Sequence, residues 1–208
     1  MVEQQIRPWD VLDNRVLEVL GTLPREAFVA EANRALAYAD LQLPIGRGEV
    51  MLKPIVEGRV LQALALQPGD SVLEVGTGSG WFAACLGALA GDVLSIDRHA
   101  DFVDAARARL DASGLGGNVA VEAADAMRWD TDRRFDAVCI SAAVAEVPER
   151  FLRWLKPGGR LFAVRGRAPA MEAILVRGGG VNAARAESLF ETDIPYLAGA
   201  EPAPEFRL

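Results

Sequence analysis

A glycine-rich stretch in the first half of the chain has the residue types best suited to binding a ligand through the backbone. It reads Val72-Leu73-Glu74-Val75-Gly76-Thr77-Gly78-Ser79-Gly80-Trp81, an apolar strand-like run followed by a turn and the start of a helix. Glycines at 76, 78 and 80 remove side chains where a backbone must pass close to a ligand. The following helix points its free N–H groups and the positive end of its dipole at the same place. An adenosine-containing cofactor is the usual occupant of such a turn, although a turn that only packs tightly would need the same glycines.

The spacing of the glycines indicates which cofactor this is. A dinucleotide site would need G-x-G-x-x-G, with a glycine at 81, where this chain has Trp81. The chain has G-x-G-x-G instead, and an acid, Glu74, stands just before it. A cationic sulfonium with an amino-acid tail suits an acidic strand end, whereas a pyrophosphate does not. The stretch resembles motif I of the class I S-adenosylmethionine (SAM) methyltransferases. This resemblance implies SAM as cofactor, held in part by Glu74, Gly76, Thr77, Gly78, Ser79 and Gly80.

Further candidates for the cofactor site follow the later strand patterns. Asp97, with Arg98 next to it, ends the second strand pattern, where a carboxylate can accept hydrogen bonds from both ribose hydroxyls of an adenosine. Asp125 follows the third and is placed to accept from the adenine amine, with Ala126 beside the ring. Ser141 ends the fourth among small residues, as a strand beneath a methyl donor needs. Both acids have a plain alternative as turn residues.

The chemistry of methyl transfer makes few demands on side chains. A sulfonium methyl group is already activated, so the protein mainly aligns the acceptor and excludes water. A carboxylate acceptor is nucleophilic at neutral pH and needs no general base. The chain has one histidine, His99, which we expect to be solvated, and no obvious base. The sequence therefore favours a carboxyl acceptor over an alcohol.

Alternating strand and helix patterns from residue 68 onward must position these groups. Strand patterns cover 71–75, 92–97, 119–122, 135–141 and 160–164, and helix patterns cover 81–90, 100–112 and 148–155. A turn is expected at 156–159. Segments 173–177 and 185–190, separated by Gly178-Gly179-Gly180, are expected to close the sheet as an antiparallel pair. The sequence predicts an α/β fold with a doubly wound, Rossmann-like and mostly parallel sheet.

We expect a single domain over residues 1–208 with three parts. Residues 1–67 form a helical N-terminal extension, 68–198 the SAM-binding core and 199–208 an irregular tail. In the extension, Asp13 is expected to cap a helix that runs through Leu20 and ends at Gly21. Pro54 is expected to open a second helix. Between these helices, residues 43–48 are expected to form a loop.

Composition excludes several function classes. With 208 residues, 51% of them hydrophobic, the chain can bury a core of its own. Its net charge of -7 gives no support for a nucleic-acid partner. The two cysteines, Cys85 and Cys139, lie in apolar stretches and are expected to be buried and reduced, and no metal site is expected. The N-terminus has no apolar core of a signal peptide, and no run is long enough to span a membrane, so a cytoplasmic location is expected.

Most of the chain resembles the protein-L-isoaspartate O-methyltransferase family. Three stretches carry the specific part of the likeness: Met1-Val2-Glu3-Gln4-Gln5-Ile6, Leu23-Pro24-Arg25-Glu26-Ala27-Phe28-Val29, and Ala37-Tyr38-Ala39-Asp40 with Leu43-Pro44-Ile45-Gly46. The glycine turn and Leu155-Lys156-Pro157-Gly158-Gly159-Arg160-Leu161 add to it but occur in many SAM enzymes. The resemblance implies a monomeric cytosolic enzyme that methylates the free α-carboxylate of isoaspartyl residues in aged proteins or peptides.

One stretch departs from the family pattern. After Gly-x-Gly the family usually reads Gln-Thr-Ile-Ser-Gln-Pro, in which the serine helps to hold the isoaspartyl carboxylate. In this chain Val50, Met51, Leu52 and Lys53 stand where that pattern has Thr-Ile-Ser-Gln. A leucine cannot donate a hydrogen bond, which leaves the acceptor charge less well satisfied by about 1–3 kcal/mol. Lys53 or Arg47 could supply a positive partner, or both could be solvated loop charges.

Three hypotheses follow. The first is SAM-dependent methylation of isoaspartyl carboxylates. The second keeps SAM but changes the acceptor to another carboxylate or a small molecule, because of the altered stretch 50–53. The third is a SAM-binding or structural homologue without transfer activity. Binding of S-adenosylhomocysteine and methylation of an isoaspartyl peptide distinguish them.

Overall fold

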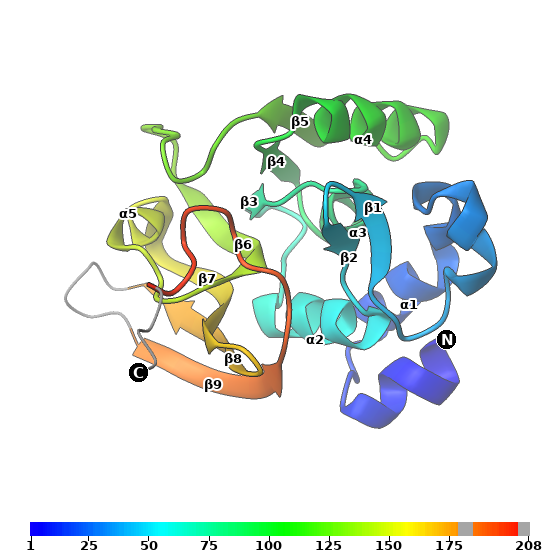
Figure 1. Cartoon of the computed structure of the whole chain (residues 1–208), viewed down its shortest axis with the longest axis horizontal. Coiled ribbons are helices and arrows are strands. Elements are labelled where there is room, and N and C mark those ends of the chain that lie inside the picture. The colour runs from blue at the N-terminus through cyan, green and yellow to red at the C-terminus, as the bar shows by residue number, and fades with distance from the viewer. Residues whose placement is uncertain (179–184, 204–208) are drawn as a thin grey trace, which may run out of the picture.

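The computed structural model describes residues 1–178 and 185–203. Among these residues a seven-stranded sheet forms the centre of the molecule, in the order β5-β4-β3-β6-β7-β8-β9 (Figure 1). Its strands are β3 (Ser71–Val75), β4 (Asp92–Asp97), β5 (Val119–Ala123), β6 (Phe135–Val144), β7 (Leu155–Arg167), β8 (Ala170–Arg177) and β9 (Arg185–Thr192). Strands β3 to β7 pair in parallel, and β8 and β9 add antiparallel. The α/β, mostly parallel fold with a C-terminal antiparallel pair is confirmed.

Both faces of the inner strands β3, β4 and β6 are mostly buried, which explains their apolar composition. Alternate side chains of β3 point to opposite faces, so that Val72 belongs to one apolar cluster and Leu73 to the other. The first cluster includes side chains of α1 (Asn14–Thr22), α2 (Pro54–Leu64), α3 (Trp81–Leu89) and α4 (Ala100–Ala112). The second includes Phe151 of α5 (Glu149–Leu152) and Trp154, whose rings stack 4.6 Å apart.

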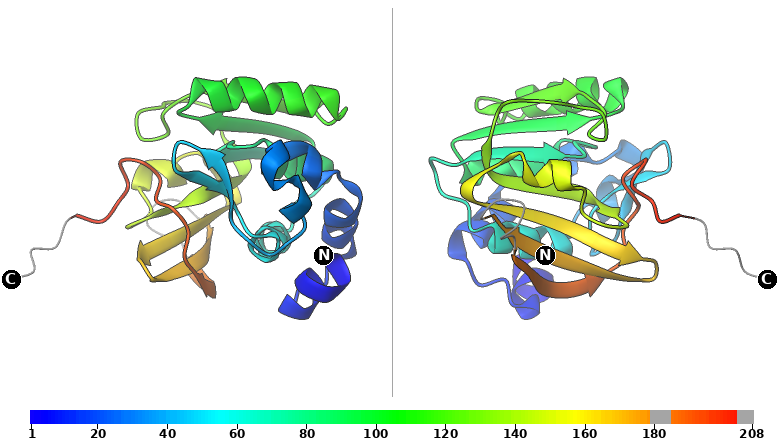
Figure 2. Two further views of the ribbon diagram at one scale, coloured as in Figure 1. Left: turned by 45° about the vertical axis from the view of Figure 1, so that its right-hand side comes forward. Right: turned by 90° about the vertical axis from the view of Figure 1, so that its left-hand side faces the viewer.

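The N-terminal part lies against α2 and α3 on the side of the first cluster (Figures 1 and 2). Helix α1 begins after Asp13, whose Oδ1 accepts the N–H of Arg15 at 2.9 Å, as predicted. Short turns precede and follow it: η1 (Val2–Ile6), η2 (Arg7–Trp9), η3 (Arg25–Phe28) and η4 (Glu31–Leu36). A hairpin of β1 (Leu43–Gly46) and β2 (Glu49–Met51) then leads into α2, which begins at Pro54 as predicted.

Some predicted boundaries were wrong for local reasons. Gly21 lies inside α1, which ends one residue later because Leu23 precedes a proline and is extended. Segment 43–48 is a hairpin and not a loop: Arg47 and Gly48 both have positive φ, 55° and 81°, as a tight hairpin turn requires.

The elements after β6 also differ from the sequence pattern. The expected helix 148–155 is only α5, and the expected turn 156–159 lies within β7, where the register against β6 shifts and Gly158 has a φ of 77°. Gly179 and Gly180 lie outside the described residues. Of the tail, residues 199–203 contain no strand or helix, and 204–208 lie outside the described residues.

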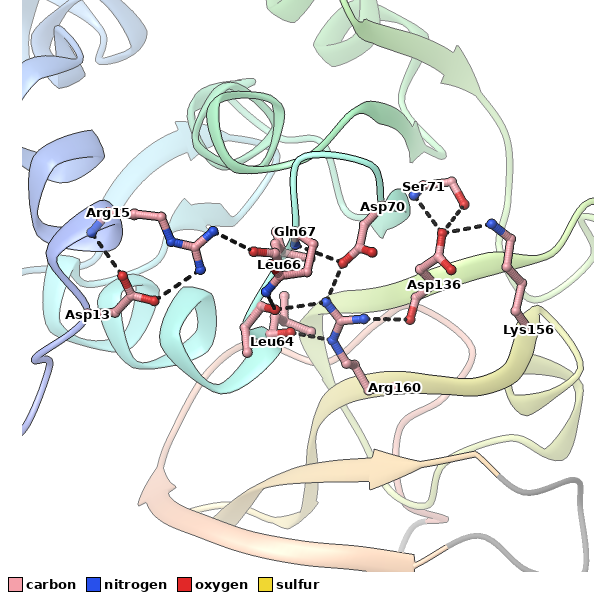
Figure 3. Close-up of polar contacts among 11 residues, drawn as sticks. Asp13, Arg15, Leu64, Leu66, Gln67, Asp70, Ser71, Asp136, Lys156 and Arg160 are labelled. Atoms are coloured by element: carbon pink, nitrogen blue, oxygen red, sulfur yellow. Dashed lines mark hydrogen bonds and ion pairs between the residues drawn. The ribbon is translucent and has the colours of Figure 1, made fainter.

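A polar network ties the amino ends of three strands together (Figure 3). Arg160 of β7 donates to Asp70 Oδ2 at 2.6 Å and to the carbonyl oxygens of Ala65, at 3.2 Å, and Leu64, where α2 ends. Beside it, Asp136 Oδ2 accepts from Ser71 N at 2.8 Å, Ser71 Oγ at 2.9 Å and Lys156 Nζ at 2.7 Å. These contacts fix the sheet at the edge opposite to its carboxyl ends.

The Asp136 contacts predict a loss of stability in acid. Partial burial alone would raise the pKa of Asp136, but Lys156 and the two donors of Ser71 outweigh it and lower the pKa from 3.8 to about 2. Since the folded pKa lies below the unfolded one, this stabilisation is complete above pH 3.8 and is lost as the pH falls toward 2. Between pH 5 and pH 2 we expect the wild type to lose about 2 kcal/mol more unfolding free energy than Asp136→Asn, in urea titrations. Exposed Asp132→Asn is the control and should follow the wild type; an equal loss in Asp136→Asn would contradict the assignment.

Candidate functional site

A cavity lies at the carboxyl ends of β3, β4, β5 and β6, where the chain order of the parallel strands reverses. Ligands of open α/β sheets bind at such switch points. The β1–β2 hairpin, α4 and a C-terminal segment after β9 complete its wall. The lining residues are Ile45, Glu49, Val50, Val75, Gly76, Gly78, Ile96, Asp97, Arg98, His99, Phe102, Ala124, Asp125, Ala126, Ser141, Ala142, Tyr196, Leu197 and Ala198.

The glycine turn is shaped by contacts that only glycine allows. Gly76 and Gly78 have φ values of 100° and 50°, in the left-handed region. The Gly76 N–H donates to the Ile96 carbonyl at 2.8 Å, which ties the turn to β4. A Cβ at Gly78 would lie 3.0 Å from Ile45 Cδ1 of the hairpin. The turn therefore presents bare backbone to the cavity, as a nucleoside cofactor needs.

Asp97 organises the turn as well as facing the cavity. Its Oδ2 accepts the Gly78 N–H at 2.9 Å and its Oδ1 accepts the His99 N–H at 2.9 Å. These two bonds fix the carboxylate plane, and each oxygen keeps a lone pair for another donor. A pair of adjacent hydroxyl donors, such as those of a ribose, fits this arrangement.

Glu74 lies beneath the turn and does not line the cavity. Its side chain is fully buried; Oε2 accepts from Ser95 Oγ at 2.5 Å, and Oε1 has no hydrogen-bond partner among the described residues. Burial raises its pKa to about 8, although the Ser95 hydroxyl opposes this. A buried carboxyl with an unsatisfied oxygen is costly unless a donor or cation comes close. The acidic floor thus fits a cationic cofactor better than an anionic one.

The opposite end of the cavity suits a flat, mostly apolar ring. Asp125 holds its own loop by accepting the Met127 N–H at 3.0 Å, and Ala126 is buried beside it. Across the cavity, the rings of His99 and Phe102 lie edge to face with centroids 5.3 Å apart. His99 is half-buried in this wall, so the expectation that it is solvated was wrong.

The stretch 50–53 is divided between the cavity and the core. Val50 lines the cavity, whereas Met51 and Leu52 are buried in the first apolar cluster, 5% and 7% exposed. Lys53 is exposed and does not line the cavity. Arg47 also points elsewhere, because it pairs with Asp101 of α4 at 3.0 Å. Glu49, half-buried next to Val50, brings a second carboxylate to the wall, where burial and the charge of Asp97 raise its pKa.

Sequence reasoning missed the wall formed by Tyr196, Leu197 and Ala198. The segment is bonded to the end of β6: Ala143 N donates to the Pro195 carbonyl at 2.8 Å, and Leu197 N donates to the Ala143 carbonyl at 2.7 Å. Tyr196 Oη donates to the Gly166 carbonyl and accepts the Ala168 N–H, both at 3.0 Å. No local sequence pattern predicts this wall, because the residues that it bonds to, in β6 and around the end of β7, lie far away in the sequence.

The structure thus brings together part of the predicted set. Around the cavity lie Val50, Gly76, Gly78, Asp97, Arg98, Asp125, Ala126 and Ser141. The other predicted residues do not line the cavity: Met51, Leu52, Lys53, Glu74, Thr77, Ser79 and Gly80. Thr77 and Ser79 are buried; Thr77 Oγ1 lies 2.6 Å from Ser95 Oγ, and Ser79 Oγ accepts the Trp81 N–H at 3.3 Å, so both brace the turn.

The described residues hold neither a metal site nor a membrane-spanning helix. Over residues 1–178 and 185–203, no group of three or more His, Cys, Asp and Glu side chains is arranged to hold a metal ion. Helices long and apolar enough to cross a membrane are also absent from this part of the chain. The two cysteines are buried and unpaired.

Known proteins with similar sequences and folds agree with each other. The family model described as protein-L-isoaspartate(D-aspartate) O-methyltransferase matches residues 1–175. A protein-L-isoaspartate O-methyltransferase of Rhodopseudomonas palustris is 39% identical over 203 residues, 97% of this chain and 93% of that protein. One from Methylorubrum extorquens is 44% identical over 161 residues, 77% of this chain and 70% of that protein.

Among solved structures, one comes from Plasmodium falciparum, a protein provisionally named protein-L-isoaspartate O-methyltransferase in complex with S-adenosyl-L-homocysteine. It matches with a TM-score of 0.81 at 18% identity, over 92% of this chain and 94% of that one. At this identity the match shows the fold alone. The family model and the curated relatives, which cover most of the sequence, show more: the chain belongs to the protein-L-isoaspartate(D-aspartate) O-methyltransferase family.

Proposed function

We propose that this protein is a SAM-dependent O-methyltransferase that methylates the free carboxylate of L-isoaspartyl residues in damaged proteins or peptides. The observation that carries the proposal is the cavity at the switch point, with a bare glycine turn, the doubly anchored Asp97 and an acidic floor at Glu74. Membership of the family supports the same activity. We further propose that the enzyme works in the cytoplasm, as its family resemblance implies.

Several of the predicted residues have a part in this proposal. Asp97 accepts from the ribose hydroxyls, Asp125 from the adenine amine, and the backbone of Gly76 and Gly78 faces the rest of the nucleoside. Glu74 lies under the place of the amino-acid tail and sulfonium, accepts from Ser95 and has one oxygen without a partner among the described residues. Burial raises its pKa to about 8, and a cation bound above it would favour its charged form. When bound, SAM supplies an activated methyl group.

The chain's remaining task is to hold the acceptor carboxylate in line and to keep water out. Two parts of the lining are not assigned to the nucleoside. They are the β1–β2 hairpin, with Val50, and the C-terminal wall, with Tyr196 to Ala198. We assign the acceptor to the space between them. Since a carboxylate is already a nucleophile, no side chain needs to remove a proton.

Two measurements test the proposal. In calorimetric titration S-adenosylhomocysteine should bind and should raise the melting temperature. Labelled SAM should then transfer methyl to an isoaspartyl peptide and not to the same peptide with normal aspartate. No binding would leave only a structural role, and binding without transfer would leave a different acceptor.

A different acceptor is the second candidate, because the hairpin side of the cavity has changed chemistry. Val50 offers no hydrogen bond, and Glu49 adds a negative charge that repels a carboxylate. Another small carboxylate or a neutral small molecule would then be methylated. A panel of such acceptors, tested with labelled SAM beside the isoaspartyl peptide, decides between the two.

The position of Val50 leads to a prediction about the acceptor. Val50→Thr places a hydroxyl donor in the cavity wall with almost no change of volume. We expect it to raise kcat/KM for an isoaspartyl peptide about fivefold, the effect of one added hydrogen bond of about 1 kcal/mol. The matched control is Leu52→Ser, another substitution toward the family pattern. Since Leu52 lies in the core, this change should destabilise the fold without improving methylation. An unchanged kcat/KM in Val50→Thr would show that this side chain does not reach the acceptor.

A further inference from the structure

A fully buried arginine, Arg25, lies at the centre of the N-terminal part. Its side chain is 0% exposed, and all three of its nitrogens donate. Nε donates to the Ala37 carbonyl and Nη2 to the Leu52 carbonyl, both at 2.8 Å, while Nη1 pairs with Glu57. Buried arginines are rare because desolvating the charge is expensive. Packing alone therefore does not account for a charged side chain at this position.

The partner of Arg25 extends the contact to the cofactor side. Glu57, 1% exposed, lies on α2, and its Oε2 also accepts from Trp81 Nε1 at 3.0 Å. Trp81 is the first residue of α3 and follows the last glycine of the turn. The Arg25 guanidinium also lies over the Trp81 ring, 5.3 Å from its centre. One buried ion pair thus joins the end of the hairpin to the start of the cofactor helix.

The contacts to the hairpin side are backbone contacts. The Leu52 carbonyl comes two residues after Val50, which lines the cavity. A second hydrogen bond fixes the start of α2, which follows the hairpin. The Ile55 N–H donates to Asp40 Oδ1 at 3.0 Å. In Figure 2 the N-terminal segments, the hairpin and α2 lie together on one side of the sheet. A change at Arg25 would reach Val50 through the backbone of residues 50–52, because Arg25 holds the Leu52 carbonyl.

We propose that Arg25 and Glu57 are a positioning pair, which fixes the hairpin end at Val50–Leu52 relative to the glycine turn and so holds acceptor and methyl donor in line. The purpose of this alignment, methyl transfer, rests on the proposed function. The positioning itself rests on the contacts of Arg25 and Glu57 alone. Neither residue touches the cavity, so both act through others. Displacement of reacting groups by about 1 Å can lower a rate by about 100-fold.

The test uses Arg25→Lys, which keeps the charge but cannot reach three acceptors at once. We expect kcat for the isoaspartyl peptide to fall about 10- to 100-fold, with the KM for SAM within about twofold of the wild type. In the complex with S-adenosylhomocysteine, amide hydrogen exchange at residues 49–52 should accelerate, while the amides of the glycine turn should not change. Glu57→Gln, which keeps the size and one acceptor, should show the same pattern more weakly and serves if Arg25→Lys does not fold.

The control is Phe151→Leu in the second apolar cluster, which should lower stability without touching this network. If Arg25→Lys and Glu57→Gln lose stability like the control but keep wild-type kcat and exchange at 49–52, the pair is only structural and the proposal fails. If the wild type does not methylate the peptide at all, the proposed function fails instead. In that case hydrogen exchange at residues 49–52 still tests whether the pair positions the hairpin end.

Discussion

Replacing Asp97 by alanine is expected to weaken the binding of S-adenosylhomocysteine by about 2–4 kcal/mol, roughly 30- to 1,000-fold. Two losses add up. The variant removes the acceptor of the ribose hydroxyls, and it frees the N–H groups of Gly78 and His99, which the carboxylate holds at 2.9 Å each. Because Asp97 is only 8% exposed, water cannot fully replace these bonds. The turn then has to be ordered again when the cofactor binds.

Calorimetric titration measures this loss, and two further variants interpret it. Asp97→Asn keeps one oxygen acceptor and should fall between the wild type and alanine. Asp104→Ala removes an exposed carboxylate from α4 whose partner is Arg107, and should bind like the wild type. An affinity of Asp97→Ala equal to that of the wild type would reject the ribose role. A lower melting temperature with unchanged affinity would show that Asp97 stabilises the glycine turn but does not bind the cofactor.

The sequence predicted those site residues whose position depends on local structure. Gly76, Gly78, Asp97 and Asp125 all lie at the carboxyl ends of parallel strands or within three residues after them. These ends meet at one edge of the sheet. An apolar run, a glycine spacing and an acid at a strand end are enough to place them together. The same reasoning gave β3, β4 and α4 with their observed bounds.

Residues whose position depends on distant contacts could not be found in this way. Leu52 was compared with a serine that faces the acceptor, yet its side chain turns into the core while its carbonyl meets Arg25. Tyr196 reaches the cavity only because its segment returns to β6, and its hydroxyl bonds to the β7–β8 turn. Neither contact has a periodic pattern or a spacing. Both require the completed sheet.

Gly80→Ala is expected to lower the free energy of unfolding by about 3 kcal/mol. Gly80 has a φ of 86°, which costs an alanine about 1 kcal/mol. Its Cβ would also lie 2.9 Å from Ala106 Cβ and 3.1 Å from Ala106 Cα, on the face of α4 that packs against the turn. Backbone cannot move aside as a flexible side chain can, so overpacking adds about 1–3 kcal/mol. Urea titration measures the sum.

The two contributions can be separated because the chain offers matched glycines. Gly114→Ala has a similar φ of 67° but nothing within 4 Å of its Cβ, so it should show the backbone cost alone, about 1 kcal/mol. Adding Ala106→Gly to Gly80→Ala should recover only the part of the overpacking that comes from the Ala106 Cβ, because the Ala106 Cα at 3.1 Å remains. The coupling of the two changes measures the Cβ–Cβ contact. If Gly80→Ala costs no more than Gly114→Ala, α4 does not press on the turn. The close approach of α4, which carries the Phe102 wall of the cavity, would then not depend on a glycine at 80.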